Sequence, residues 1–167
     1  MQLVSGRKEL PNMIGVCGDN CSYCPRYMAT QNGNATDLQK VKELWVRLGL
    51  RGLTFPAREL TCLGCKPDSK CAYSELRTCA CEKGIDNCGL CEAYPCKMIN
   101  AAFERSEKLR THATRVCTPE EMDTLNKAFF SKKQNLDKIH SDMNQGRKEQ
   151  RPANKPLHRT ADKPGSR

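Results

Sequence analysis

The sequence Cys17-Gly18-Asp19-Asn20-Cys21-Ser22-Tyr23-Cys24 places three cysteines within eight residues. Eight more of the twelve cysteines fall between positions 62 and 96, a stretch with few aliphatic side chains. Such a stretch cannot bury a conventional hydrophobic core large enough to offset the conformational entropy lost on folding, so another interaction must organise it. The cysteines therefore decide the fold.

The spacing of these cysteines is typical of metal ligands. Cys62 and Cys65 form a C-x2-C pair, as do Cys88 and Cys91, and so short a loop can aim two sulfurs at one ion about 2.3 Å away. The candidate ligands are Cys17, Cys21, Cys24, Cys62, Cys65, Cys71, Cys79, Cys88, Cys91 and Cys96, with Cys81 as a weaker candidate. Cys117 stands apart from the clusters and is expected to be structural.

The first three cysteines cannot complete a four-sulfur site by themselves. We therefore expect Cys17, Cys21 and Cys24 to share one ion with a distant cysteine. Cys62 and Cys65 are both candidates for this fourth ligand, and the spacing does not choose between them.

Zinc is the favoured metal, as two or three ions. Closed four-cysteine zinc sites are commonly built from C-x2-C pairs, and they contribute folding free energy that a loop-rich segment lacks. An iron–sulfur cluster and thiol redox chemistry are the alternatives. The C-x3-C-x2-C spacing also resembles the cluster loop of radical S-adenosylmethionine enzymes, but 167 residues without an alternating strand–helix pattern cannot supply the barrel that those enzymes need. We interpret that match as coincidental.

The behaviour of cysteine depends on the cellular compartment. Residues 1–16 contain no apolar run long enough for a signal peptide, and no later segment reaches the roughly 18 apolar residues of a membrane span. We expect a cytoplasmic protein without membrane contact, where reducing conditions favour metal thiolates over disulfides.

The formal net charge of +9 is unevenly distributed. Residues 146–167 carry seven Lys or Arg against Glu149 and Asp162, whereas in the body each zinc with four thiolates would contribute a net charge of about −2. The tail's charge permits contact with RNA or another polyanion, but its lack of aliphatic side chains favours a solvated, disordered segment. We predict a metal-binding domain over 1–144 and a disordered basic tail over 145–167.

Three helices are predicted around the cysteines, at 36–48, after Cys96 and from Thr118 onward. The first is expected to have Thr36 as its N-cap, and the third begins with Thr118-Pro119-Glu120-Glu121, a capping box with proline at the first helical position. Apolar residues recur at spacings of three and four in the third helix, until Lys132 occupies a position where an apolar residue is due. This helix is expected to pack on its own domain, with a partner-binding seam as the alternative.

The predicted fold is thus small and mainly α: irregular, metal-organised loops flanked by about three helices, with no large sheet. Several separated motifs, in order, also resemble a prokaryotic cysteine-rich family known as domain of unknown function 3795. The matching stretches are 17–25, 62–65, 76–80 with 82–84, 87–91, 94–96 and 135–139. The resemblance implies zinc binding, for which the family is regarded as a candidate, but no established activity.

This chain departs from the family pattern at two positions. Ser74 stands where such sequences often have a cysteine, and Cys81 is an addition. One site is therefore expected to use a shifted ligand or to stay incomplete.

The function predicted from these features is a zinc-binding protein with structural metal, acting as an interaction or regulatory module for an unknown protein partner. The loop around Tyr23 and Tyr27 is a candidate contact surface. No Ser/His/Asp set, paired carboxylates or phosphate-binding glycine loop indicates an enzyme. His112, His140 and His158 lack ligand spacing and are expected to be solvated.

Overall fold

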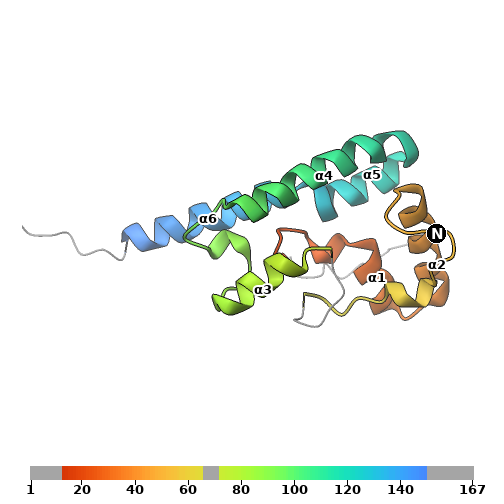
Figure 1. Cartoon of the computed structure of the whole chain (residues 1–167), viewed down its shortest axis with the longest axis horizontal. Coiled ribbons are helices and arrows are strands. Elements are labelled where there is room, and N and C mark those ends of the chain that lie inside the picture. Colours follow the sequence, from red (N-terminus) through yellow and green to blue (C-terminus); the bar gives the residue numbers. More distant parts are fainter. Residues whose placement is uncertain (1–12, 66–71, 150–167) are drawn as a thin grey trace, which may run out of the picture.

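The computed structural model describes residues 13–65 and 72–149. These residues form helices and loops without a β-strand, and their one recorded β-bridge joins Ile14 to Asn20. The predicted mainly α fold is confirmed (Figure 1).

A long helical hairpin forms one side of the molecule (Figure 1). Helix α4 (Lys97–Val116) turns at Thr118 into α5 (Pro119–Leu125), which continues through the π-helical segment η4 (Asn126–Phe130) into α6 (Lys132–Glu149). Thr118 Oγ1 accepts from the Glu121 N–H, and Glu121 Oε2 accepts from the Thr118 N–H. This is the predicted capping box, and it satisfies two backbone donors at the helix start.

Helices α1 (Pro25–Asn32) and α2 (Ala35–Arg47) lie together beside the first cysteine loop. The prediction of Thr36 as the N-cap of the first helix was wrong. Pro25 begins α1 because its fixed φ suits the first helical position. Gly33 ends α1 at φ 64°, and Asn34 rather than Thr36 caps α2 by accepting from the Thr36 N–H at 2.9 Å.

The cysteine-rich region also contains a helix that the sequence analysis did not predict, α3 (Ser74–Glu82). Its buried face is short, with Leu76 and Ala80 one turn apart and 4% and 2% exposed. Two apolar side chains do not establish a helical period by themselves. The prediction that 62–96 is loop-like throughout is therefore wrong over 74–82.

Two hydrophobic cores are formed. In the first core, Val16, Cys17 and Cys88 from the cysteine loops pack against α3, α4 and Leu136 of α6. The second core joins α1 and α2 to the end of α4, to α5 and to η4. It includes Trp45, Leu60, Ala113, Leu125 and Phe130. The cysteine loops are thus part of a packed interior rather than appendages to it.

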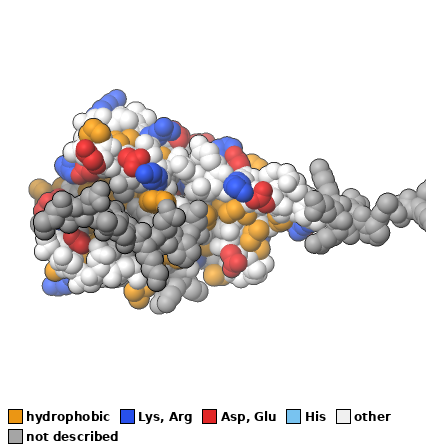
Figure 2. Space-filling model, turned by 180° about the vertical axis from the view of Figure 1, so that it is seen from behind, with side chains coloured by type: hydrophobic (Ala, Val, Ile, Leu, Met, Phe, Trp, Pro, Cys, Tyr) orange, Lys and Arg blue, Asp and Glu red, His pale blue; other side chains and the backbone are white. Residues whose placement is uncertain are grey.

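Charged side chains of both signs are interspersed on the face shown in Figure 2, which has no single large basic patch among its described residues. Three Lys–Asp pairs, at 127/123, 133/137 and 138/142, follow the i,i+4 spacing of neighbours on a helix surface. The described helices include none with the length and apolar character of a membrane span. Helix α6 continues to Glu149, past the predicted domain boundary at 144, and the rest of the predicted tail lies outside the described residues.

Candidate metal centres

Two cysteine loops share one local structure, built on the sequence Asn-Cys-x-x-Cys. In the first, Asn20 Oδ1 accepts from the Ser22 N–H at 3.1 Å, and the Cys24 N–H donates to Cys21 O at 3.1 Å. In the second, Asn87 Oδ1 accepts from the Gly89 N–H at 3.0 Å, and the Cys91 N–H donates to Cys88 O at 3.1 Å. Each asparagine therefore caps a 3₁₀ turn that carries one cysteine at each end.

The first of these loops meets the C-x2-C pair at Cys62 and Cys65, and we call Cys21, Cys24, Cys62 and Cys65 the first thiol cluster. The Cys21 thiol donates to the Cys65 sulfur, and Cys24 and Cys62 lie close enough to interact electrostatically. Gly15 allows Cys65 to lie this close to the first loop, because a Cβ at Gly15 would lie 2.9 Å from Cys65 Sγ.

The segment that leads into Cys62 is held in place by α1. The guanidinium of Arg26 donates to Leu60 O and Thr61 O, and Thr30 Oγ1 accepts from the Cys62 N–H at 2.9 Å. These bonds place Cys62 beside the loop that carries Cys21 and Cys24, although the two segments are separated by nearly forty residues in the sequence.

The thiols of the first cluster differ in proton affinity. The hydrogen bond from Cys21 lowers the pKa of Cys65 to about 6, and the same contact, with burial, raises the pKa of Cys21. Burial raises the pKa of Cys24 to about 12. Of these three thiols, Cys65 therefore loses its proton most readily.

Cys17, the remaining cysteine of the first loop, has a different partner. Its thiol donates to Asp19 Oδ2 at 3.2 Å, and Asp19 Oδ1 lies 3.0 Å from Lys132 Nζ. The Lys132 side chain is 3% exposed, and its ammonium also donates to the Tyr73 hydroxyl at 3.1 Å. Burial acts to lower the pKa of Lys132, but Asp19, Cys17 and Tyr73 together outweigh burial, and the pKa is raised. Lys132, which interrupts the apolar spacing of the predicted third helix, is therefore one partner of a buried ion pair.

The second thiol cluster consists of Cys79, Cys88, Cys91 and Cys96, which line one cavity of about 20 Å³. Burial raises the pKa of Cys88 to about 11, and the neighbouring thiols of Cys96, Cys79 and Cys91 act in the same direction. Lys83 Nζ donates to Cys91 Sγ at 3.3 Å. The cluster unites α3, the second loop and the start of α4.

Helix α6 closes over both loops at glycines. A Cβ at Gly18, where φ is 91°, would lie 2.5 Å from Lys132 O, and a Cβ at Gly89 would lie 2.8 Å from Leu136 O. Both close approaches therefore require glycine. One helix rests on both cysteine loops, with the fully buried Leu136 between them.

Hydrogen bonds from α6 extend this contact. His140 Nδ1 donates to Gly89 O at 2.9 Å, and the Tyr94 hydroxyl donates to Asp137 Oδ1 at 2.7 Å. His112 Nε2 similarly donates to Arg47 O at 3.1 Å. His112 is exposed, as expected for a solvated side chain, whereas His140 is half-buried against Gly89 O, so the expectation of a solvated side chain was wrong for His140. His158 lies outside the described residues.

The other cysteines lie apart from the two clusters. Cys81 is exposed on α3, and Cys117 packs against the second core, as its expected structural role requires. Cys71 lies outside the described residues.

The chemistry of the clusters fits a tetrahedral zinc ion in the number and kind of donors, since each offers four sulfurs. Within 13–65 and 72–149, however, no three Cys, His, Asp or Glu side chains are gathered as tightly as bound metal ligands are. Zinc binding would require the sulfurs to draw together around the ion.

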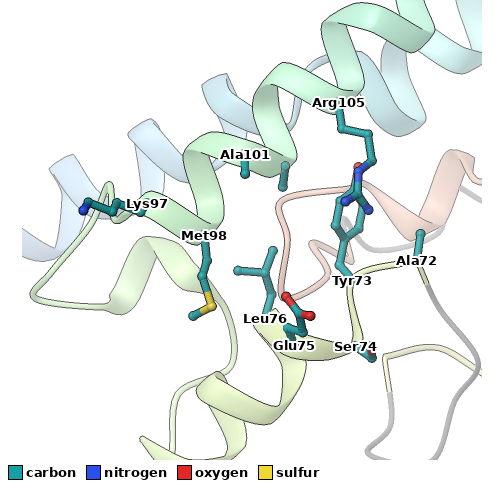
Figure 3. A pocket seen from close by; sticks show the side chains of 10 residues that line it. Ala72, Tyr73, Ser74, Glu75, Leu76, Lys97, Met98, Ala101 and Arg105 are labelled. Carbon is teal, nitrogen blue, oxygen red and sulfur yellow. The ribbon is translucent and has the colours of Figure 1, made fainter.

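Two larger cavities lie near the clusters. The central cavity, of about 200 Å³, is bordered by the first thiol cluster, Trp45, Leu109, Phe129 and Lys132. The α3–α4 groove, of about 330 Å³, has no cysteine among its described lining residues. Figure 3 shows this groove, where Arg105 reaches from α4 over the ring of Tyr73; both residues also line the central cavity.

The sequence analysis missed two kinds of site residue. The first comprises Asn20 and Asn87, whose signal was the repeated asparagine directly before a C-x2-C pair. The second is the Asp19–Lys132 pair. Its only signal was that a lysine occupies a helix position where an apolar residue was expected. Its partner lies 113 positions earlier, so no local pattern could identify it.

The fold and the two thiol clusters define a small, mainly α, cysteine-rich domain. The family model described as protein of unknown function (DUF3795) matches residues 13–101, which is more than half of the chain. The chain belongs to this family, and both thiol clusters lie within the matched residues. No curated protein matches the chain, and no solved structure matches it.

Proposed function

We propose that the chain is a zinc-binding protein with two structural ions, one held by each thiol cluster. The observation that carries this proposal is the division of eight cysteines into two sets of four, each built around an Asn-Cys-x-x-Cys loop. Four thiolates make a closed zinc site that leaves no open position for a substrate. Such sites stabilise folds rather than perform chemistry.

The second thiol cluster supports zinc over an iron–sulfur cluster. Its cavity of about 20 Å³ has room for one small species, since a water molecule already needs about 10–15 Å³ by this measure. A cluster of several iron and sulfide atoms would need far more space. Lys83, whose ammonium lies against Cys91, would offset part of the −2 charge of a zinc–thiolate site.

Exposed side chains at the loop tips support a role in presenting a contact surface. Tyr23 is 44% exposed between Cys21 and Cys24, and Leu63 is 66% exposed between Cys62 and Cys65. A metal that fixes these loops would also fix the two side chains. We therefore propose that a protein partner binds this surface.

Metal analysis of anaerobically purified protein tests the proposal. We expect two zinc ions per chain, no visible absorption, and loss of helical circular dichroism when the metal is chelated. Stoichiometric iron with acid-labile sulfide would contradict it, as would a protein that stays fully folded without metal.

A matched pair of variants on α3 tests the ligand assignment. Cys79→Ser should lose about one zinc equivalent, whereas Cys81→Ser, two residues away on the same helix, should keep both. Equal zinc content in the two variants would refute the second cluster as defined here.

A further inference from the structure

The central cavity is larger than a zinc site requires and reaches beyond the sulfurs. Its buried lining includes Trp45, Ser106 and Lys132, which are 6%, 4% and 3% exposed. Arg51 and Arg105 also line it and are exposed. The lining therefore combines buried side chains with two solvent-exposed guanidinium groups.

Part of the lining is apolar. Trp45 and Phe129 meet edge to face with ring centroids 6.0 Å apart, and Leu109 of α4 lies beside the same space. A volume of about 200 Å³ slightly exceeds the roughly 150 Å³ of an apolar cavity known to hold benzene. One ring, or a short acyl chain, with a small polar group would fill it.

The charges of the lining are unbalanced. Asp19 is the one carboxylate among the described lining residues, and it is paired with Lys132. The guanidinium of Arg105 lies over Tyr73 at 5.6 Å, and that of Arg51 lies over Phe55 at 5.1 Å and donates to Leu50 O. Neither arginine forms an ion pair with a described carboxylate, and each guanidinium has more donors than these contacts use.

We propose that the central cavity binds a small organic monoanion, namely a single aromatic ring or short acyl chain that carries one carboxylate. The apolar body lies against Trp45, Leu109 and Phe129, and the carboxylate lies against the exposed guanidinium groups of Arg51 and Arg105. The site does not depend on the identity of the metal.

Trp45 is the single tryptophan of the chain, so its fluorescence reports on the cavity directly. Zinc-loaded full-length protein is titrated with benzoate and hexanoate as probes, and with benzyl alcohol as the neutral analogue of benzoate. Ligand-observed NMR provides a second readout that does not depend on Trp45. We expect saturable binding of at least one carboxylate, at least about tenfold tighter than benzyl alcohol binding, because the carboxylate gains charge-assisted hydrogen bonds.

Two arginine variants on α4 locate the anion. Arg105→Gln should weaken carboxylate binding by about tenfold. Arg110→Gln, on the same helix but outside the central cavity's described lining, should bind as the wild type does. Unchanged zinc content and circular dichroism in both variants show that the fold and the metal are intact.

Three results would overturn the proposal: no saturable binding of either carboxylate, equal binding of benzyl alcohol, or undiminished binding by Arg105→Gln. Zinc content is measured separately in every sample. A failure of the ligand site is therefore distinguishable from a failure of the proposed zinc sites.

Discussion

Lys132 Nζ lies 3.0 Å from Asp19 Oδ1, so a buried ion pair joins the first turn of α6 to the first cysteine loop. Both side chains are largely out of solvent, at 3% and 14% exposed. The cost of burying two charges is offset when both partners are present, and removal of one leaves the other uncompensated.

Lys132→Met is therefore expected to destabilise the zinc-loaded protein by about 3–5 kcal/mol, measured by urea unfolding. The adjacent Lys133→Met, which removes an exposed pair with Asp137, should change stability by less than about 0.5 kcal/mol. Adding Asp19→Asn to Lys132→Met should recover part of the loss, because no unpaired charge then remains. Similar changes in stability for the two lysine variants would show that the buried pair contributes no more to stability than the exposed pair.

Gly89→Ala should also be destabilising, by about 1–3 kcal/mol. Its new Cβ would lie 2.8 Å from Leu136 O and 3.1 Å from Ile139 Cβ, so α6 would have to move off the second loop. Gly52→Ala is the control, because no atom lies within 4 Å of a Cβ there. Thermal unfolding of both variants measures the difference, and a Gly89→Ala protein as stable as the Gly52→Ala control would contradict the close approach of α6.

Removal of α6 should abolish stable zinc binding. The residues matched by the family model end at 101, yet Leu136 is fully buried and α6 contacts both loops. A chain ending at Ser131 is expected to lose near-ultraviolet circular dichroism and to hold fewer than two zinc ions, whereas a chain ending at Glu149 keeps all of α6 and should hold both. Two tightly bound zinc ions in the shorter chain would show that the clusters form without α6.

Zinc affinity should increase steeply with pH. Burial raises the pKa of Cys24 to about 12 and that of Cys88 to about 11, and Cys21 is raised as well, so these thiols are protonated near neutral pH and must lose a proton to bind zinc. The hydrogen bond from Cys21 lowers the pKa of Cys65, so Cys65 contributes less to this pH dependence.

Each proton released makes binding about tenfold tighter per pH unit. Zinc binding by the first thiol cluster should therefore tighten about 100-fold or more between pH 6.5 and 7.5, and binding by the second about tenfold or more. Competition with a chromophoric chelator, using Cys79→Ser to isolate the first cluster and Cys24→Ser to isolate the second, measures the two separately. Affinities that do not change with pH would argue against thiol ligands.

The helices that could be predicted are those with strong local signals. Thr118 and Glu121 form the capping box that their spacing indicates, because capping depends on residues three positions apart. Helix α3 was missed because only two of its buried side chains, Leu76 and Ala80, are apolar. The cap of α2 was assigned to Thr36 although Asn34 occupies it, because threonine and asparagine are both favoured N-cap residues.

The sequence by itself determined the mainly α class, the family and the identity of the candidate ligands, because helix caps, apolar periods and cysteine spacing are all local properties. The tertiary structure alone decided that Cys21 and Cys24 meet Cys62 and Cys65, that Cys17 turns instead to Asp19, and that Lys132 is buried. The meeting of the four cysteines joins segments about 40 residues apart, and the burial of Lys132 against Asp19 joins segments more than 100 residues apart. These relationships depend on how the packed helices bring the loops together, and no pattern among residues close in the sequence predicts that arrangement.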